Sequence, residues 1–283
     1  MRAPLPDLPA EPFFLKTDQG TRFCLYHHPR FTHECRGALI YIHPFGDEMN
    51  KSRRMAAMQA RAFAAAGFGV LQIDLFGCGD SSGEFREARW NIWKQDLLAA
   101  RKWIGDRTKA PISLWGLRLG ALLALDFARS SPQGIHGIIL WQPVISGESF
   151  LTQFLRLQLA NEMLVGGQEK KGSTHALRSA LAAGKILEVA GYELPPELAS
   201  AIDGLKAMEL AVRGMRIHWF EVVAEEGRGL PPSAKKVVDA WKQNEVDLHM
   251  HLVACLPFWA TQEISECAAL VSATTSAYLP GHE

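Results

Sequence analysis

The feature that most constrains this fold is a regular alternation between short, unbroken apolar runs and longer segments of helical composition. Runs this short that are apolar on both faces are typical of strands buried within a parallel sheet. The apolar runs are Gly37–Ile42, Gly69–Asp74, Pro111–Trp115 and Gly137–Trp141, and the predicted helices are Arg54–Ala66, Trp90–Gly105 and Leu119–Ala128. The alternation predicts an α/β fold with a mostly parallel central sheet flanked by helices.

Further elements extend this sheet towards both ends of the chain. Glu11–Arg30 holds two apolar runs around a polar turn with glycine, which predicts a hairpin. In the last third of the chain, Ile217–Val223 and His249–Val253 are predicted strands, separated by a helix at Ser233–Asn244. A final helix is expected from about residue 263 to Tyr278.

The alternation is interrupted by a mostly helical segment from Ser146 to about Arg213. An insertion of this size between two core strands predicts a helical cap over the sheet edge. We therefore expect a core domain made of residues 1–145 and 214–283, and a helical cap at residues 146–213. Phe150 and Phe154 in the cap either line a ligand pocket or pack onto the core.

Composition narrows the classes of partner and compartment. Lys+Arg and Asp+Glu both total 30, so the net charge is zero, which gives no basis for nucleic-acid binding or a basic membrane surface. No uncharged apolar run reaches the ~20 residues of a spanning helix, so no transmembrane segment is expected. The five cysteines are scattered, which favours a reducing compartment, and we expect a soluble cytoplasmic protein.

A nucleophile elbow is predicted where the third apolar run meets the following helix. The segment is Gly116-Leu117-Arg118-Leu119-Gly120, and it has the strand, Gly-x-Nuc-x-Gly and helix order of that motif. The glycines let strand and helix pack closely, and the helix N-terminus directs partial positive charge at the central residue. That central residue is Arg118, where a serine hydrolase needs a nucleophile.

Two other loops agree with this frame. His43-Pro44-Phe45-Gly46 follows the first apolar run, and Asp74 to Gly83 is a glycine-rich turn after the second. With the elbow, they resemble the α/β-hydrolase superfamily over nearly the whole chain, although Cys78 stands where that turn usually has histidine. The resemblance implies an oxyanion-hole amide in the His43–Gly46 loop.

A narrower resemblance rests on four further segments. The segments are Phe45–Met55, the elbow with its arginine, Trp141–Val144 and Val189–Leu194. Together they resemble the exosortase A system-associated hydrolase 2 family. That resemblance implies a link to exopolysaccharide production and PEP-CTERM protein sorting, and a partner protein from that system.

The other two triad positions also lack catalytic residues. In working members an acid follows a late strand and a histidine follows the last strand. Alignment of those loops places Gly227 at the acid, with Glu225 and Glu226 nearby, and Pro257 at the histidine. Because a guanidinium stays protonated and offers no lone pair, Arg118 cannot attack an acyl carbon. The sequence therefore predicts a degenerate triad and a pseudoenzyme.

Two interpretations of Arg118 remain open. It either binds a small anionic ligand beside the helix N-terminus, or it pairs with Asp47, Glu48 or Glu226 and fills the site. The candidate ligand-binding residues are Arg118, His43, Phe45, Gly46, Leu119 and Glu226. His43 either donates to a ligand or caps its own loop.

Three functions remain open at this point. The first is a non-hydrolytic protein that binds an anionic ligand or a partner protein. The second is a hydrolase or acyltransferase of the ester or thioester class, with a relocated nucleophile such as Cys78 or Cys255. The third is a pure scaffold with a filled pocket. No cofactor is expected, because the sequence lacks metal-ligand spacing and a nucleotide-binding glycine motif.

Overall fold

The computed structural model describes residues 9–30, 35–165 and 173–279, with the side chains of residues 161–165 left out. Its main feature is a central sheet in the order β1-β2-β4-β3-β5-β6-β9-β10. From β4 to β10 neighbouring strands are parallel, and β1 and β2 join as an antiparallel hairpin. The strands are β1 (Glu11–Thr17), β2 (Gly20–His27), β3 (Gly37–Ile42), β4 (Phe68–Ile73), β5 (Ile112–Leu117), β6 (Ile135–Trp141), β9 (Arg216–Val223) and β10 (Leu248–Ala254).

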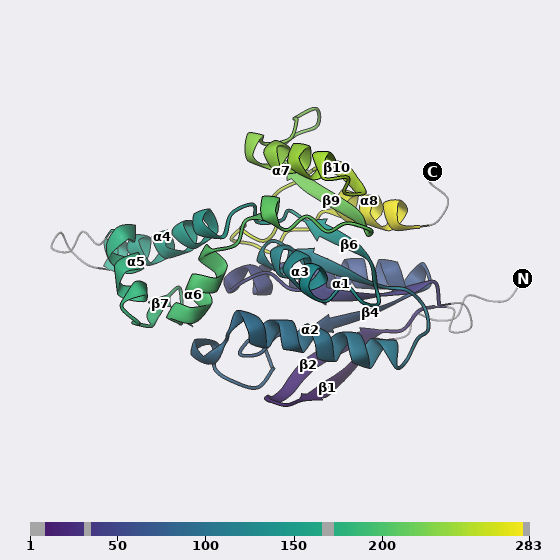
Figure 1. Cartoon of the computed structure of the whole chain (residues 1–283), viewed down its shortest axis with the longest axis horizontal. Coiled ribbons are helices and arrows are strands. Elements are labelled where there is room, and N and C mark those ends of the chain that lie inside the picture. Colours follow the sequence, from purple (N-terminus) through teal and green to yellow (C-terminus); the bar gives the residue numbers. More distant parts are fainter. Residues whose placement is uncertain (1–8, 31–34, 166–172, 280–283) are drawn as a thin grey trace, which may run out of the picture.

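Helices cover both faces of this sheet (Figure 1), as the alternation predicted. One face packs against α2 (Trp90–Gly105), α3 (Leu119–Ser130) and α7 (Pro232–Gln243). The other packs against α1 (Asp47–Ala65) and α8 (Ala268–Tyr278), which lie side by side. The sheet thus separates two apolar cores, since strand side chains alternate between its faces.

The starts of two helices differ from the sequence expectation by several residues. Helix α1 begins at Asp47 rather than Arg54, because Gly46 turns the chain with a φ of 56° and Asp47 and Glu48 complement the positive end of the helix. Helix α8 begins at Ala268 rather than near residue 263, with the Cys267 side chain accepting a hydrogen bond from the Leu270 amide.

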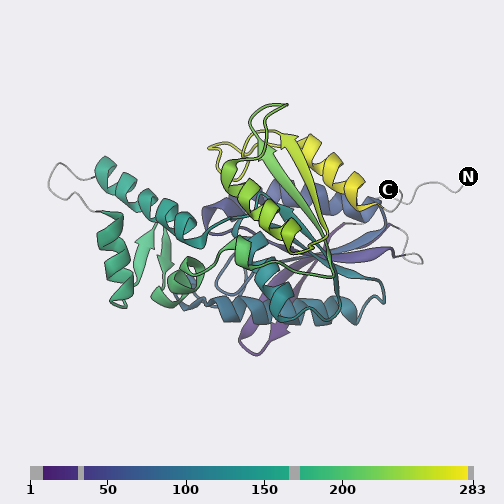
Figure 2. The ribbon, with the colours of Figure 1, turned by 45° about the horizontal axis from the view of Figure 1, so that its top comes forward.

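The segment between β6 and β9 lies together beyond one end of the sheet (Figures 1 and 2). Its main helices are α4 (Gly147–Val165), α5 (Thr174–Ala182) and α6 (Pro196–Asp203). A short hairpin of β7 (Leu187–Val189) and β8 (Tyr192–Leu194), which the sequence did not predict, joins α5 to α6. The same segment contains the 3₁₀ turn η3 (Ala207–Glu209), whereas the other 3₁₀ turn, η2 (Phe85–Glu87), lies between β4 and α2. We call residues 146–213 the cap segment.

Candidate functional site

The turn between β5 and α3 has the backbone of a nucleophile elbow. Arg118 has φ 56° and ψ −117°. Residues other than glycine rarely adopt a positive φ. A Cβ on Gly120 would lie 2.3 Å from the Ile42 carbonyl oxygen, and one on Gly116 would lie 2.5 Å from the Ala121 Cα. Both glycines are therefore required for α3 to pack directly against the sheet.

The Arg118 side chain pairs with Glu48 across the elbow. Its Nε donates to Glu48 Oε1 at 3.2 Å, and the two side chains are only 18% and 22% exposed. The guanidinium carbon lies 5.5 Å from the centre of the Trp259 ring. Of the three acids that the sequence offered as partners, the structure selects Glu48, which stands in the first turn of α1.

A cavity of about 250 Å³ adjoins this ion pair. Arg118 and Glu48 form part of its wall, so the pair does not fill the site. Five aromatic side chains from the core and the cap segment form a large part of the remaining wall. They are Phe45, Phe150, Phe154, Tyr192 and Trp259.

The charges around the cavity are largely matched. Lys51 Nζ lies 3.0 Å from Asp47 Oδ2, and Arg118 is paired with Glu48. Burial raises the pKa of the Glu48 carboxyl, while Arg118 opposes that shift. Glu48 Oε2 is buried with no hydrogen-bond partner within the described part of the chain. The neutral form of Glu48 is therefore favoured more than in water, which leaves the Arg118 charge less fully compensated.

The terminal nitrogens of Arg118 are the groups most suited to a ligand. Among the described residues, the guanidinium makes its one side-chain hydrogen bond through Nε, and Nη1 and Nη2 make none. The first amides of α3 also lack intrahelical acceptors, as in any helix. This places unsatisfied donors beside a helix N-terminus, which is an arrangement that favours anions.

Of the other predicted site residues, some lie at the cavity and others lie in exposed loops away from it. Phe45 lines the cavity, and Leu119 and Gly46 border a separate small void of about 10 Å³, which Phe45 also lines. Glu226 and Gly227 are exposed in the loop after β9 and do not line the cavity. Pro257 is exposed in the loop after β10, although Trp259 of the same loop does line the cavity.

His43 is held by its own loop. Its Nδ1 donates to the Pro44 carbonyl oxygen at 2.7 Å, and its Nε2 accepts from the Leu75 amide at 3.2 Å. Burial lowers the pKa of the imidazole, which is therefore neutral with both nitrogens engaged. Of the two roles considered for His43, the structure favours the loop cap.

The candidate nucleophiles lie away from the cavity wall. Cys78 is buried beside the small void, and its burial raises the pKa of the thiol, so the reactive thiolate is disfavoured. Cys255 does not line the cavity, and within the described chain its wall contains no serine, cysteine or histidine. Ser81 and Ser82 bind backbone groups of β2 and the turn after β4, which is a structural role.

Two residues near the elbow, the half-buried Gln142 and the buried Glu221, were missed by sequence reasoning. Gln142, directly after β6, has φ 41° and donates to Glu221 Oε1 at 3.1 Å. Glu221 on β9 also accepts from Trp219 Nε1 at 2.8 Å, and burial raises the pKa of its carboxyl, while Arg118 opposes that shift. An acid inside the apolar run Ile217–Val223 was the only sequence signal for this group.

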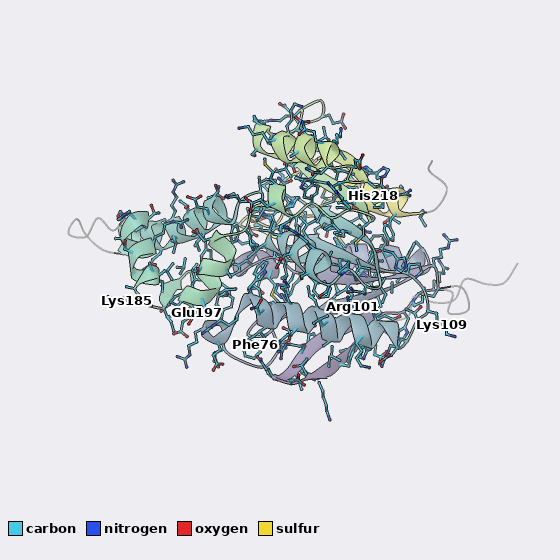
Figure 3. The ribbon with its side chains drawn as sticks, viewed as in Figure 1. Phe76, Arg101, Lys109, Lys185, Glu197 and His218 are labelled. Atoms are coloured by element: carbon cyan, nitrogen blue, oxygen red, sulfur yellow. The ribbon has the colours of Figure 1, made fainter. Side chains whose placement is uncertain are left out.

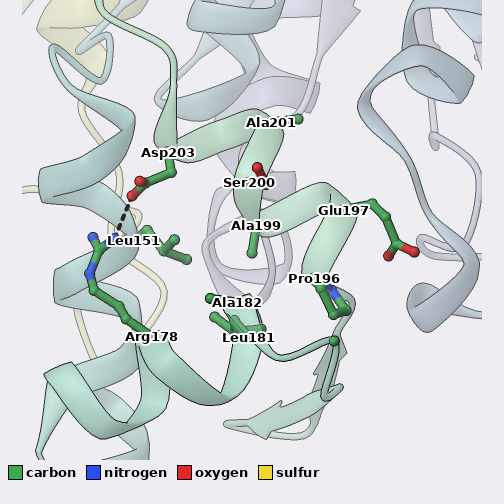
Figure 4. A pocket seen from close by; sticks show the side chains of 11 residues that line it. Leu151, Arg178, Leu181, Ala182, Pro196, Glu197, Ala199, Ser200, Ala201 and Asp203 are labelled. Carbon is green, nitrogen blue, oxygen red and sulfur yellow. Dashed lines mark hydrogen bonds and ion pairs between the residues drawn. The ribbon is translucent and has the colours of Figure 1, made fainter.

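A second, larger hollow lies within the cap segment (Figure 4). It measures about 680 Å³ and is lined by residues of α4, α5 and α6. Its main cation, Arg178, is already engaged by Asp203 Oδ1 at 2.6 Å and by Thr152 Oγ1 at 2.7 Å. Because those charges satisfy each other and the strained elbow is elsewhere, the smaller cavity is the better candidate site.

The described residues contain no group of three or more His, Cys, Asp or Glu side chains arranged to hold a metal. Within the same residues, no helix is both long and apolar enough to cross a membrane. His218, His249 and His251 stack together on β9 and β10, and Figure 3 shows His218 far from Glu197 of the cap segment. These histidines do not line the elbow cavity.

Residues 33–183, more than half of the chain, match the family described as serine aminopeptidase, S33. The chain belongs to this family. No curated protein matches the sequence. The family match supports the resemblance of the loops and the elbow to the α/β-hydrolase superfamily. The narrower resemblance to the exosortase A system-associated hydrolase 2 family stays a prediction.

Solved structures share the fold at low sequence identity. Est1E from Butyrivibrio proteoclasticus with ferulic acid bound is 14% identical, with a TM-score of 0.67 over 94% of this chain and 95% of that one. A carboxyl esterase from Bacillus coagulans in complex with glycerol is 16% identical, with a TM-score of 0.60 over 87% and 90%. Proline iminopeptidase from Mycobacterium smegmatis is 13% identical, with a TM-score of 0.60 over 94% and 97%. The fold is that of an α/β-hydrolase.

Proposed function

We propose that this protein is a non-hydrolytic member of its family, and that its elbow cavity binds a small organic anion with an apolar or aromatic body. The observation that carries the proposal is Arg118 at the nucleophile position, with its terminal nitrogens unbonded among the described residues. A guanidinium there cannot form an acyl-enzyme, but it can bind a carboxylate with two parallel hydrogen bonds.

The wall of the cavity supports an amphipathic ligand over a simple inorganic ion. Phe45, Phe154 and Trp259 offer flat apolar surfaces, while Arg118 supplies the charge at one side. A ring stacked on these side chains gains apolar burial, and its carboxylate meets the guanidinium. Est1E, which shares the fold, has been solved with ferulic acid, an aromatic carboxylate that makes a suitable probe.

The proposed context follows from the narrower resemblance. If the chain acts in an exosortase-associated system in the cytoplasm, its ligand or partner belongs to exopolysaccharide production or protein sorting. A partner protein that inserts an acidic side chain into the cavity would use the same chemistry as a small anion. Ferulic acid tests the chemistry of the site and does not depend on that context.

Isothermal titration calorimetry with ferulic acid and with its methyl ester tests the proposal. We expect the acid to bind and the neutral ester to bind at least several-fold more weakly. Arg118→Ala should remove this preference, and Arg118→Lys should keep part of it, because lysine retains the charge without the bidentate geometry. Arg61→Ala, on the exposed side of α1, is the matched control and should behave as wild type.

The same preparations should be assayed for hydrolysis of a p-nitrophenyl ester. We expect no turnover above the buffer rate, in wild type or in Arg118→Ser, because no histidine lines the cavity in the described chain. Turnover that is lost in Cys78→Ser or Cys255→Ser would instead establish the relocated-nucleophile alternative. Equal binding of acid and ester would contradict the anion site.

A further inference from the structure

A single aromatic ring separates the elbow cavity from a second hollow. Phe45 lines both the cavity and the void of about 10 Å³. Its ring meets Phe150 and Phe154 of the cavity wall edge to face, at 5.7 and 5.0 Å between ring centres. It also meets Phe85 and Trp93 of the void wall edge to face, at 5.4 and 6.2 Å. The Phe45 ring therefore stands between the two spaces.

The wall of the void suits an apolar group. It includes Leu75, Leu123 and Trp90, and within the described chain it contains no Asp, Glu, Lys or Arg. His43 also lines the void, but its Nδ1 donates to the Pro44 carbonyl oxygen and its Nε2 accepts from the Leu75 amide. A space of this size holds about one water molecule at most. While Phe45 keeps its place, the void is therefore too small for part of a ligand.

The elbow connects the two hollows along the chain. Arg118 lines the cavity, whereas the next two residues, Leu119 and Gly120, line the void. Consecutive Cα atoms lie about 3.8 Å apart, so the void begins within a few ångströms of the Arg118 backbone. A chain whose carboxylate meets the Arg118 guanidinium would therefore have only the Phe45 ring to pass before it reached the void.

The Phe45 ring is a fixed barrier. Its side chain is 5% exposed, and aromatic rings contact it from both hollows. The backbone on either side is held, because His43 is hydrogen-bonded on both ring nitrogens and the Met49 amide donates to the Gly46 carbonyl oxygen at 3.1 Å. Side chains packed this closely leave little room for a ring to swing aside.

We propose that Phe45 limits the length of the ligand that the elbow cavity accepts, so that the site selects a compact anion and excludes one with a long apolar tail. The cavity of about 250 Å³ lies just below the range of about 300–1,000 Å³ that is usual for sites of drug-sized ligands. The charge of this ligand class rests on the proposed function, whereas the length limit rests on the position of Phe45.

Calorimetry with two chain lengths and two head groups tests the proposal. The probes are ω-phenylpropanoic and ω-phenylheptanoic acid, together with the corresponding neutral alcohols. Phe45→Ala joins the void to the cavity. We expect the affinity for the long acid relative to the short one to be at least about tenfold higher in Phe45→Ala than in wild type, since each methylene that enters an apolar space adds roughly fourfold.

Further variants locate the added space. Cys78 lines the void and not the cavity, so Cys78→Leu in the Phe45→Ala background should refill the void and reverse most of the gain. Phe14→Ala is the matched control, because the Phe14 ring is 57% exposed on β1, and it should keep the wild-type ratio. If Phe45→Ala does not fold, Phe45→Leu decides the question, with an expected ratio a few-fold above wild type.

The outcomes separate the length limit from the charge preference. An equal ratio of long to short ligands in wild type and in the Phe45 variants, for acids and alcohols alike, would overturn the length limit. A gain that survives Cys78→Leu would also overturn it, because the tail would then occupy a different space. Equal affinities of acids and alcohols, with the gain in Phe45→Ala intact, would count against the proposed function alone.

Discussion

At the scale of single residues, Arg118 combines an unfavourable backbone with a partly desolvated charge. A non-glycine residue at φ 56° costs on the order of 1–3 kcal/mol, which the surrounding strand and helix must offset. The Glu48 pair compensates the charge but leaves Glu48 Oε2 without a partner in the described residues. Replacing one member of such a pair leaves the charge of the other member buried without compensation, which is destabilising.

The affinity of the elbow cavity for a carboxylate should therefore depend on pH through Glu48. Because burial raises the pKa of Glu48, lowering the pH protonates it and frees Arg118 for the ligand. We expect ferulic acid to bind several-fold more tightly at pH 5.5 than at pH 7.5, measured by calorimetry. Glu48→Gln should bind with a nearly flat pH profile at the tighter level. Weaker binding of wild type at the lower pH would contradict this coupling.

At the scale of elements, the contact between β5 and α3 depends on the absence of side chains. A Cβ on Gly120 would meet the backbone carbonyl oxygens of Ile42 and His43, and backbone cannot rotate away as a side chain can. The amino end of α3 therefore lies directly on β3, and this places Arg118 at the carboxyl end of the central strands. The position of the site is thus a consequence of close packing between elements.

Gly120→Ala should destabilise the protein by roughly 2 kcal/mol or more, because α3 must shift away from the sheet to admit the methyl group. The measurement is the midpoint of urea unfolding followed by circular dichroism. Gly229→Ala provides the control, since a Cβ there meets nothing within 4 Å. Equal midpoints for the two variants would show that the elbow is more adaptable than its geometry implies.

The pairing of β9 with β10 brings three histidines together, with His218 Nδ1 3.1 Å from His251 Nε2. Desolvation, followed by the neighbouring His251 and His249, lowers the pKa of His218 from 6.5 to about 4. The unfolded chain thus binds a proton that the folded chain resists, so stability is present above pH 6.5 and is lost as the pH falls towards 4.

This histidine should make the protein about 2 kcal/mol less stable to urea at pH 5 than at pH 7 through its own titration. His218→Gln should flatten that part of the pH dependence, whereas His136→Gln, at an exposed position on β6, should leave it unchanged. An identical slope in wild type and His218→Gln would remove His218 as the source.

At the scale of the whole molecule, the cap segment and the core meet through aromatic side chains. The Phe45 ring lies 5.0 Å from Phe154 and 5.7 Å from Phe150, centre to centre and edge to face. These contacts both hold α4 against the core and form the apolar wall of the elbow cavity. Packing and ligand binding were separate alternatives for Phe150 and Phe154, and the structure is compatible with both.

Phe154→Ala should lower the stability to urea by about 2–4 kcal/mol and weaken ferulic acid binding, because it removes cap–core packing and one cavity wall together. Leu157→Ala offers a contrast on the same helix. Its side chain is 48% exposed, so we expect a stability change within about 0.5 kcal/mol but weaker binding, since Leu157 lines the cavity. Unchanged stability in Phe154→Ala would mean that the cap is held elsewhere.

Contacts between residues far apart in the chain mark where sequence reasoning met its limit. The sequence offered three acids as partners of Arg118, and the early start of α1 at Asp47 decided in favour of Glu48. The hairpin β7–β8 escaped prediction because its strands are too short to show a period.

The sequence by itself determined the α/β class, the strand Gly37–Ile42 and the arginine at the elbow. These follow from local patterns, since apolar runs and a Gly-x-x-x-Gly turn act through near neighbours in the chain. Only the tertiary structure decided that Arg118 meets Glu48 and Trp259 beside an open cavity rather than in a filled one. Side chains far apart in the chain meet there, and their distances depend on how the helices and loops pack on the sheet.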